Sequence, residues 1–158
     1  MTDAVRPERP PHAAAPQVLI CGAGPAGLAL ACALHDRGLS VRVLEQAEAD
    51  TLAAPADDGR EIALTHRSRR LLEGLGLWER LSDIAPLCSA SVRSSGSRTP
   101  LPFASPGQDL GWLVANHRLR AAAWAAAQQR GIDIRCGQTV TGFARGDRVA
   151  GVDTRHGE

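Results

Sequence analysis

The chain contains no lysine, and all 18 of its basic residues are arginines. This absence excludes a phosphate-binding loop that depends on a lysine, and any chemistry that needs a primary side-chain amine. The net charge is only +1, so electrostatic attraction for nucleic acid or for an acidic membrane surface is weak. Nucleic acid is therefore not an expected partner.

Cysteines are few and widely separated. No two of them form a CxxC pair, so the sequence predicts no zinc site and no other bound metal. Cys21 and Cys32 fall in apolar segments, where a thiol is expected to behave as a small hydrophobic side chain. This cysteine usage is typical of a protein in a reducing cytoplasm.

Long apolar runs are also missing, because glycines interrupt the longest one. No transmembrane helix is expected, since a membrane span needs about 20 predominantly apolar residues. Residues 1–16 are rich in proline and alanine, which predicts a disordered leader and not a signal peptide. The remaining residues, 17–158, are expected to form one globular domain, because 44% of the whole chain is hydrophobic.

The first part of this domain has a strand–helix–strand pattern. Short apolar runs at 17–21 and 40–45 predict strands. Between them, 25–37 predicts a helix that begins at a proline and is ended by Gly38. This order requires parallel strands joined by a right-handed crossover. Residues 50–61 are polar and predict a surface loop.

The rest of the domain is expected to mix helices with short strands, and no internal repeat is visible. Glycines, a threonine and alternating apolar positions mark the expected boundaries. The predicted elements are helices at 65–76, 77–84 and 116–131, irregular strands at 89–106, strands at 112–115 and 132–136, and an antiparallel hairpin at 139–155 that turns at 145–147. The fold class is therefore α/β, a parallel βαβ sheet with an added antiparallel β-hairpin.

The turn after the first predicted strand reads GAGPAG and has the spacing GxGxxG. Gly22 would permit a sharp turn, Gly24 would let the backbone approach a diphosphate, and Gly27 would let the helix pack closely on the sheet. The first turn of the helix, with Pro25 and Ala26, would then direct its positive dipole end at the phosphates.

Glu45 ends the second predicted strand, roughly 20 residues beyond the glycines. A carboxylate there accepts hydrogen bonds from ribose hydroxyls and would repel a 2′-phosphate, so an unphosphorylated adenosine half is expected. Together, the strand, glycine loop, helix and acid predict a Rossmann-like dinucleotide-binding domain in preference to an ordinary tight turn. The motif alone does not separate FAD from NAD.

Two later segments are more specific, DGREIALTHRSRRLLEGLGLWERL and LGWLVANHRLRAAAWAAA. Both resemble the ubiquinone-biosynthesis hydroxylases, a family of FAD-dependent aromatic monooxygenases of group A. The residues that carry the resemblance are Asp58, Arg60, Ala63, Leu64, Leu75, Gly76, Trp78, Asn116 and Leu119. The resemblance implies an aromatic-ring hydroxylase that uses FAD and O2, with NADPH or NADH as the external reductant. It also implies an aromatic small-molecule substrate, a quinone precursor.

The same resemblance implies roles for three polar residues. Arg60 would lie near the flavin and the diphosphate, and Asn116 or Arg118 would reach the ribityl or phosphate region. Simpler alternatives are a solvated loop arginine at 60, an N-cap at Asn116 and a solvent-facing Arg118. Trp78 and Trp124 are expected to pack against the core and not to stack on a substrate. No residue is identified as catalytic.

The family also carries motifs that this chain does not contain. They include an Asp-Gly segment after the hairpin, a Gly-Asp segment near the flavin ring, and a sheet that covers the substrate. Residues 17–158 are therefore expected to be the N-terminal part of a truncated FAD-binding domain, inactive alone. An NAD-dependent oxidoreductase domain and a non-catalytic nucleotide-binding module remain open as alternatives. The expected setting is the cytoplasm, and a quinone precursor is compatible with peripheral association with the inner membrane or with a biosynthetic complex.

Overall fold

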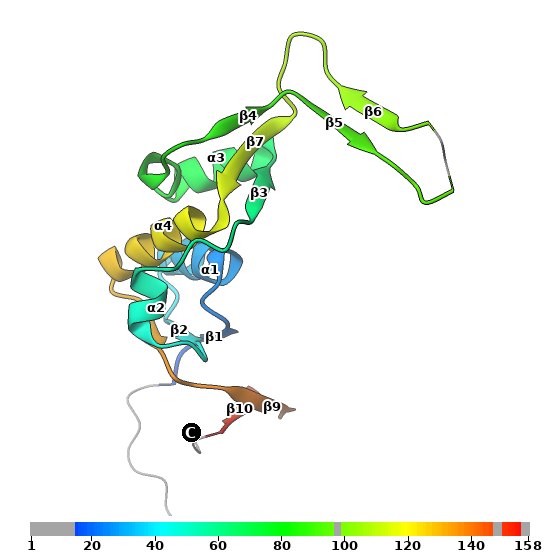
Figure 1. The fold of residues 1–158 in the computed structure, drawn as a ribbon. Coiled ribbons are helices and arrows are strands. Elements are labelled where there is room, and N and C mark those ends of the chain that lie inside the picture. Colours follow the sequence, from blue (N-terminus) through cyan, green and yellow to red (C-terminus); the bar gives the residue numbers. More distant parts are fainter. Residues whose placement is uncertain (1–14, 97–98, 147–149, 156–158) are drawn as a thin grey trace, which may run out of the picture.

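A computed structural model describes residues 15–96, 99–146 and 150–155. The predicted leader lies outside this described part, except for Ala15 and Pro16. Figure 1 shows three layers in the body of the molecule: a parallel sheet, a layer of helices above it, and an antiparallel sheet above the helices. Two hairpins extend from opposite ends of this body.

The parallel sheet contains the predicted βαβ unit. Strand β1 (Val18–Cys21) pairs with β2 (Val41–Leu44), which in turn pairs with β8 (Asp133–Arg135). Helix α1 (Pro25–His35) connects β1 to β2. The carboxyl ends of the strands therefore lie at one edge of the sheet, next to the start of α1.

Helix α1 begins at its proline and ends near its glycine, as the sequence predicts. Pro25 occupies the first helical turn, where its missing N–H costs nothing. The last helical residue is His35, two residues before the predicted end. Gly38 has φ +81°, a left-handed conformation that favours glycine, and its N–H donates to the carbonyl of His35 at 2.8 Å.

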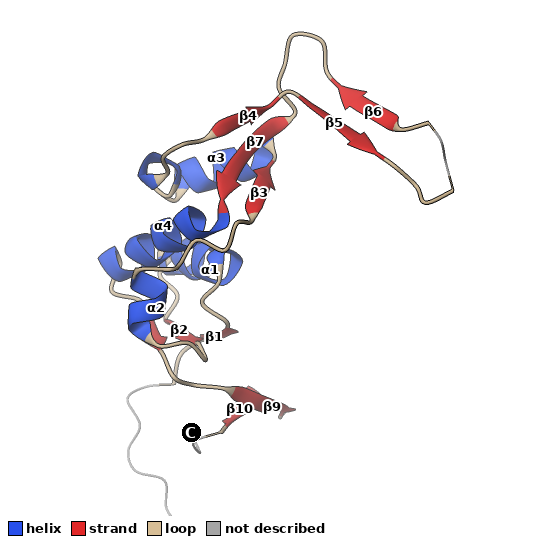
Figure 2. Ribbon diagram, in the orientation of Figure 1, coloured by secondary structure: helices blue, strands red, loops and turns tan. Residues whose placement is uncertain are grey.

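Two further helices lie in the same layer as α1, as Figure 2 shows. Helix α4 (Asn116–Gln129) packs along α1, and the short helix α2 (Ala49–Ala53) packs against α4. The prediction of a loop over 50–61 is wrong for α2. Its one buried residue, Leu52, anchors this short helix in the core, and packing of that kind outweighs the polar composition around it.

The antiparallel sheet has the order β3–β7–β4. Strands β3 (Glu61–Leu64) and β4 (Ala85–Leu87) both pair with the central strand β7 (Gly111–Ala115). Helix α3 (His66–Gly74) follows β3, and the 3₁₀ helix η1 (Trp78–Arg80) follows α3. The strand predicted at 112–115 and the helix predicted at 65–76 are thus confirmed.

Three features of this sheet differ from the sequence-based expectation. Strands β3 and β4 were not predicted, because each is short and is held by pairing to β7. Strand β4 contains Pro86, which a sheet tolerates on an edge strand. The helix predicted at 77–84 is reduced to the single turn of η1.

The two hairpins confirm the remaining strand predictions. Strands β5 (Ser89–Val92) and β6 (Leu101–Ala104) form an arm that projects from the body in Figure 1. Strands β9 (Val140–Arg145) and β10 (Ala150–Thr154) form the predicted C-terminal hairpin. Of the turn predicted at 145–147, Asp147 lies outside the described residues.

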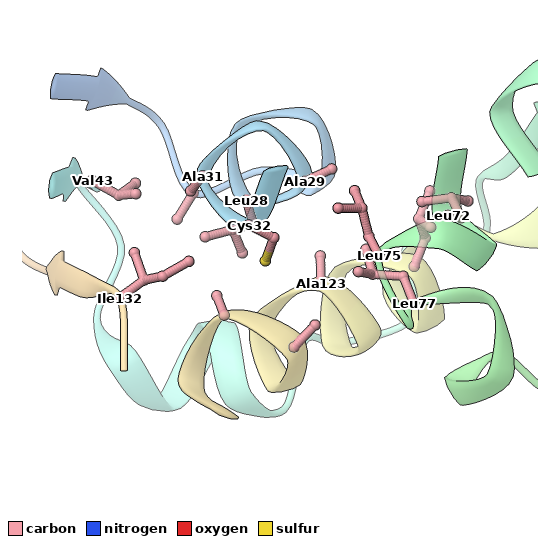
Figure 3. Close-up of a cluster of buried hydrophobic side chains, with 14 of the residues drawn as sticks. Leu28, Ala29, Ala31, Cys32, Val43, Leu72, Leu75, Leu77, Ala123 and Ile132 are labelled. Atoms are coloured by element: carbon pink, nitrogen blue, oxygen red, sulfur yellow. The ribbon is translucent and has the colours of Figure 1, made fainter. Parts of the chain in front are cut away.

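The core lies where α1 faces α4. Figure 3 shows Leu28 and Cys32 of α1 directed toward the α4 helix, whose facing side is built from alanines such as Ala123. These small side chains let the two helix backbones approach closely. Cys32 is fully buried, which confirms its prediction as a small hydrophobic residue. Trp78 and Trp124 pack against this core, also as predicted.

Candidate functional site

The glycine loop between β1 and α1 has the geometry that its spacing predicts. Gly22 has φ +102° and donates its N–H to the carbonyl of Leu44 at 2.7 Å, so it turns the chain and ties it to β2. A Cβ on Gly27 would lie 2.1 Å from the carbonyl oxygen of Gly22. Any side chain at position 27 would therefore force α1 away from β1.

Gly24 is different, because nothing in the described part of the chain requires a glycine there. Its φ and ψ, −69° and 172°, are extended values that any residue adopts, and no atom lies within 4 Å of the position of a Cβ. The small residues Gly24 and Ala26 leave the start of α1 uncovered. A group that approaches the backbone from outside is the kind of neighbour that favours glycine at this position.

The start of α1 is suited to an anion. Gly24 is the N-cap residue, and no side chain caps this helix end. The first N–H groups of a helix have no intrahelical acceptor, and the helix dipole places partial positive charge there. Pro25 has no N–H, so the donors available are those of Gly24, Ala26 and Gly27.

Glu45 faces this loop. The residue follows β2 and is half-buried, and its Oε2 accepts a hydrogen bond from the backbone N–H of Ala23 at 2.6 Å. Its Oε1 accepts from the N–H of Ala47 at 2.9 Å. A carboxylate has about four acceptor positions, so each oxygen of Glu45 retains one for a hydroxyl group. The side chain is therefore fixed and still able to accept a hydrogen bond from a hydroxyl group.

A pocket of about 180 Å³ opens beside Glu45, at the carboxyl ends of the parallel strands. Ligands of open α/β sheets bind at this edge. Gln138 contributes a buried Oε1 that has no hydrogen-bond partner in the described part of the chain, so the pocket wall holds an unsatisfied polar atom. The residues that line the pocket are Cys21, Gly22, Leu44, Glu45, Gln46, Gln138, Thr139 and Val140.

Of these lining residues, sequence reasoning identified only Gly22 and Glu45, and Cys21 and Gln138 are two of those that it missed. Cys21 was expected to behave as a small hydrophobic side chain in an apolar segment, yet it is exposed at the end of β1 and lines the pocket. Gln138 follows β8, and its N–H donates to the carbonyl of Glu45 at 2.8 Å. The available signal was the strand predicted at 132–136, since a third parallel strand must end at the same edge as β2.

A second polar cluster lies where the loop before β3 meets the start of α4. Asp58 accepts hydrogen bonds through Oδ2 from Nε of Arg60 and from Nδ2 of Asn116, both at 2.8 Å. The Arg60 guanidinium, and after it the Asn116 amide, holds the pKa of the Asp58 carboxyl well below its usual range. Arg60 and Asn116 are thus brought together by a residue that was first singled out only as part of a motif.

Asn116 does not cap a helix, so the capping alternative is wrong. It is the first residue of α4, the N-cap is Ala115, and the Asn116 side chain is directed back to Asp58. Only 6% of Asn116 is exposed, and its backbone N–H donates to the carbonyl of Arg60 at 2.8 Å. The Arg60 side chain remains 68% exposed in spite of its ion pair with Asp58.

Arg118 has different neighbours from Arg60 and Asn116. Its Nη1 donates to Oγ of Ser82 at 2.6 Å and forms an ion pair with Asp83. Its described polar contacts thus join α4 to the segment after η1, and the alternative of a simply solvated side chain does not hold. A cofactor contact by Arg118 remains a prediction.

Within 15–96, 99–146 and 150–155, no group of three or more His, Cys, Asp or Glu residues is placed to hold a metal ion. No helix in the same ranges has both the length and the apolar character needed to cross a membrane.

Sequence comparisons agree with the geometry of the glycine loop. The family described as FAD binding domain matches residues 15–156. Ubiquinone hydroxylase UbiM of Neisseria meningitidis is 40% identical over 121 residues, covering 71% of this chain and 26% of that protein. Ubiquinone hydroxylase UbiL of Rhodospirillum rubrum is 37% identical over 108 residues, covering 66% and 25%. The chain therefore spans about a quarter of the length of these two relatives.

Structural comparison gives the same fold. The crystal structure of FqzB superimposes with a TM-score of 0.69 at 28% identity, covering 89% of this chain and 33% of that one. The structure of 2-methyl-3-hydroxypyridine-5-carboxylic acid oxygenase has a TM-score of 0.62 at 24% identity, with 89% and 36% covered, and this likeness shows the fold alone. The predicted Rossmann-like fold and the resemblance to ubiquinone hydroxylases are confirmed, and the chain belongs to the FAD-binding domain family.

Proposed function

We propose that this protein binds FAD and supplies the FAD-binding, N-terminal part of an NAD(P)H-dependent aromatic-ring hydroxylase. The observation that carries the proposal is the pairing of Gly24 with Glu45. Gly24 leaves open space at the start of α1, and no described residue requires a glycine there. Glu45 directs a fixed carboxylate at the same loop. An adenosine diphosphate half matches both features.

The residues fit the chemistry of this cofactor. The first amides of α1 would hold the diphosphate, and Glu45 would accept hydrogen bonds from the ribose hydroxyls. Bound FAD supplies the redox chemistry with O2, while the chain binds and orients it. The exposed guanidinium of Arg60 would meet an anionic oxygen of the cofactor. Glu45 would repel a 2′-phosphate, which favours FAD or an unphosphorylated nucleotide at this site.

The substrate class is proposed from the relatives. Their names describe ubiquinone hydroxylases and a 3-demethoxyubiquinol 3-hydroxylase, so an aromatic quinone precursor is the proposed substrate, with O2 as co-substrate. NADPH or NADH is the proposed external reductant. The proposed setting is the cytoplasm, with peripheral association with the inner membrane or with a biosynthetic complex. No residue of the chain is proposed as catalytic.

The test is a titration of the purified chain with FAD and, separately, with NAD. FAD is expected to bind saturably, and calorimetric titration measures its affinity. NAD is expected to bind at least about tenfold more weakly, a difference of about 1.4 kcal/mol. Tighter binding of NAD than of FAD would favour the NAD-dependent oxidoreductase domain, and absence of binding by either would contradict the proposal.

A further inference from the structure

Asp58 holds the guanidinium of Arg60 along one edge. Its Oδ2 accepts from Nε of Arg60 at 2.8 Å and from Nη2 at 2.5 Å. Its Oδ1 accepts from the backbone N–H of Arg60 at 3.1 Å. These bonds leave the Nη1 donors of Arg60 outside the ion pair, on a side chain that is 68% exposed. The guanidinium is therefore oriented and still able to donate.

Asp58 is in turn held by Asn116, the first residue of α4. Asn116 donates from Nδ2 to Oδ2 of Asp58 at 2.8 Å, and its backbone N–H donates to the carbonyl of Arg60 at 2.8 Å. Asn116 is buried at the start of α4, so both bonds connect the loop to a helix of the core. Within the loop, Oδ1 of Asp57 accepts from the N–H of Gly59, which has φ +68°. The turn is thus fixed on both sides.

This arrangement has two opposite effects on an anionic ligand. The negative charge of Asp58 offsets the attraction that Arg60 exerts on an anion, so charge alone would make Asp58 unfavourable for binding. The same carboxylate removes the rotational freedom that a long exposed side chain would otherwise lose on binding, so orientation makes Asp58 favourable. The two effects predict opposite results when the charge of Asp58 is removed.

We propose that Asp58 is a positioning residue, which fixes Arg60 so that its free N–H donors meet an anionic oxygen of the bound cofactor. The inference rests on the proposed binding of FAD. Asn116 then acts through Asp58, and not by contact with the ribityl chain or the phosphates. The carboxylate and amide form a support for one arginine, and that arginine makes the contact with the ligand.

The experiment compares two variants that lose the same charge, Asp58→Asn and Asp57→Asn, in the full chain titrated with FAD. Asp58→Asn is expected to weaken FAD binding about tenfold, because the asparagine cannot accept all the bonds that orient Arg60. Asp57→Asn keeps an oxygen for the N–H of Gly59 and for Nδ1 of His117, which lies 3.2 Å from Oδ1 of Asp57, and it does not bond the guanidinium. It is therefore expected to bind FAD as tightly as the wild type or more tightly.

A double-mutant cycle separates positioning from a general structural effect. Asp58→Asn is expected to change FAD binding less than twofold when Arg60 is already replaced by alanine, because its effect passes through Arg60. Asp58→Glu keeps the charge but moves it by a methylene, and is also expected to weaken binding. Circular dichroism checks that each variant is folded, and Asp58→Glu serves as the second test if Asp58→Asn does not fold.

The outcomes are distinguishable. Unchanged or tighter FAD binding by Asp58→Asn would overturn the positioning role. The role would also be overturned if Asp58→Asn weakened FAD binding equally when Arg60 is replaced by alanine. Failure of the wild-type chain to bind FAD would overturn the proposed function, and this inference with it, before any variant is compared. The role is supported if Asp58→Asn weakens FAD binding and Asp57→Asn does not. The effect of Asp58→Asn must also disappear when Arg60 is replaced by alanine.

Discussion

At the scale of single residues, the three glycines of the loop do three different things. Gly22 adopts a positive φ that favours glycine, and Gly27 lets α1 pack against the carbonyl of Gly22. Gly24 leaves open space at the start of α1. The sequence predicted all three duties from their spacing, because the spacing reflects the geometry of a strand that turns into a helix. The structure adds that, of these three glycines, Gly24 alone has neither a conformation nor a neighbour among the described residues that requires glycine.

The close contact at Gly27 leads to a stability prediction. Gly27→Ala is expected to lower the free energy of unfolding by about 3 kcal/mol, because the added Cβ would lie 2.1 Å from a backbone oxygen that cannot move cheaply. Urea denaturation followed by circular dichroism measures the change. Gly74→Ala is the matched control, since a Cβ there meets no atom within 4 Å. Equal stability of Gly27→Ala and the wild type would contradict the packing argument.

The contacts within the polar cluster of Asp58, Arg60 and Asn116 could not be predicted from single residues. Arg60 and Asn116 were predicted from a family resemblance, but their contact through Asp58 depends on pairing between β3 and β7, which brings positions 60 and 116 together. Residues 58 positions apart give no local signal for such a contact. The pairing of short strands that are distant in the sequence is therefore known only from the structure.

At the scale of elements, the prediction succeeded where the pattern is local. The βαβ unit, α3, α4 and the C-terminal hairpin carry local signals in their own sequence, and at the start of α3, for example, Thr65 accepts from the N–H of Ser68. Strands β3 and β4 and helix α2 lack such signals. Tertiary contacts determine their structure, with β7 for the strands and with α4 for the helix.

The packing of α1 on α4 leads to a prediction about Cys32. Burial raises the pKa of this thiol, so it is expected to stay neutral and unreactive in the folded chain. A thiol reagent followed by mass spectrometry is expected to label the exposed Cys21 quickly, and Cys32 only when the chain unfolds. Labelling of Cys32 as fast as of Cys21 would show that the two helices do not stay packed.

The same raised pKa has a consequence for stability at alkaline pH. The unfolded chain ionises Cys32 near its ordinary pKa of 9.0, whereas the folded chain keeps it protonated to higher pH. The unfolded state therefore binds fewer protons in this range, and the contribution of Cys32 to stability, complete below pH 9, falls as the pH rises above it. Cys32→Ala is expected to remove this part of the pH dependence in urea denaturation.

At the scale of the whole molecule, the proposed nucleotide site lies at one edge of the parallel sheet, where β1, β2 and β8 end beside the start of α1. The order of the elements makes this edge predictable, because parallel strands place their carboxyl ends together. The contribution of β8 and of Gln138 to the pocket was less predictable, since 91 residues separate Arg42 from its ion-pair partner Asp133 on the neighbouring strand.

The central claim is that the start of α1 holds the diphosphate of FAD. It is tested most directly by calorimetric titration of FAD into the wild-type chain and into Gly24→Ala, with Gly74→Ala as control. Both substitutions add a Cβ that meets no atom of the described chain, so both variants are expected to fold. Gly24→Ala is expected to bind FAD at least about tenfold more weakly than the wild type, and Gly74→Ala equally well. Equal FAD affinity in all three proteins would contradict the account.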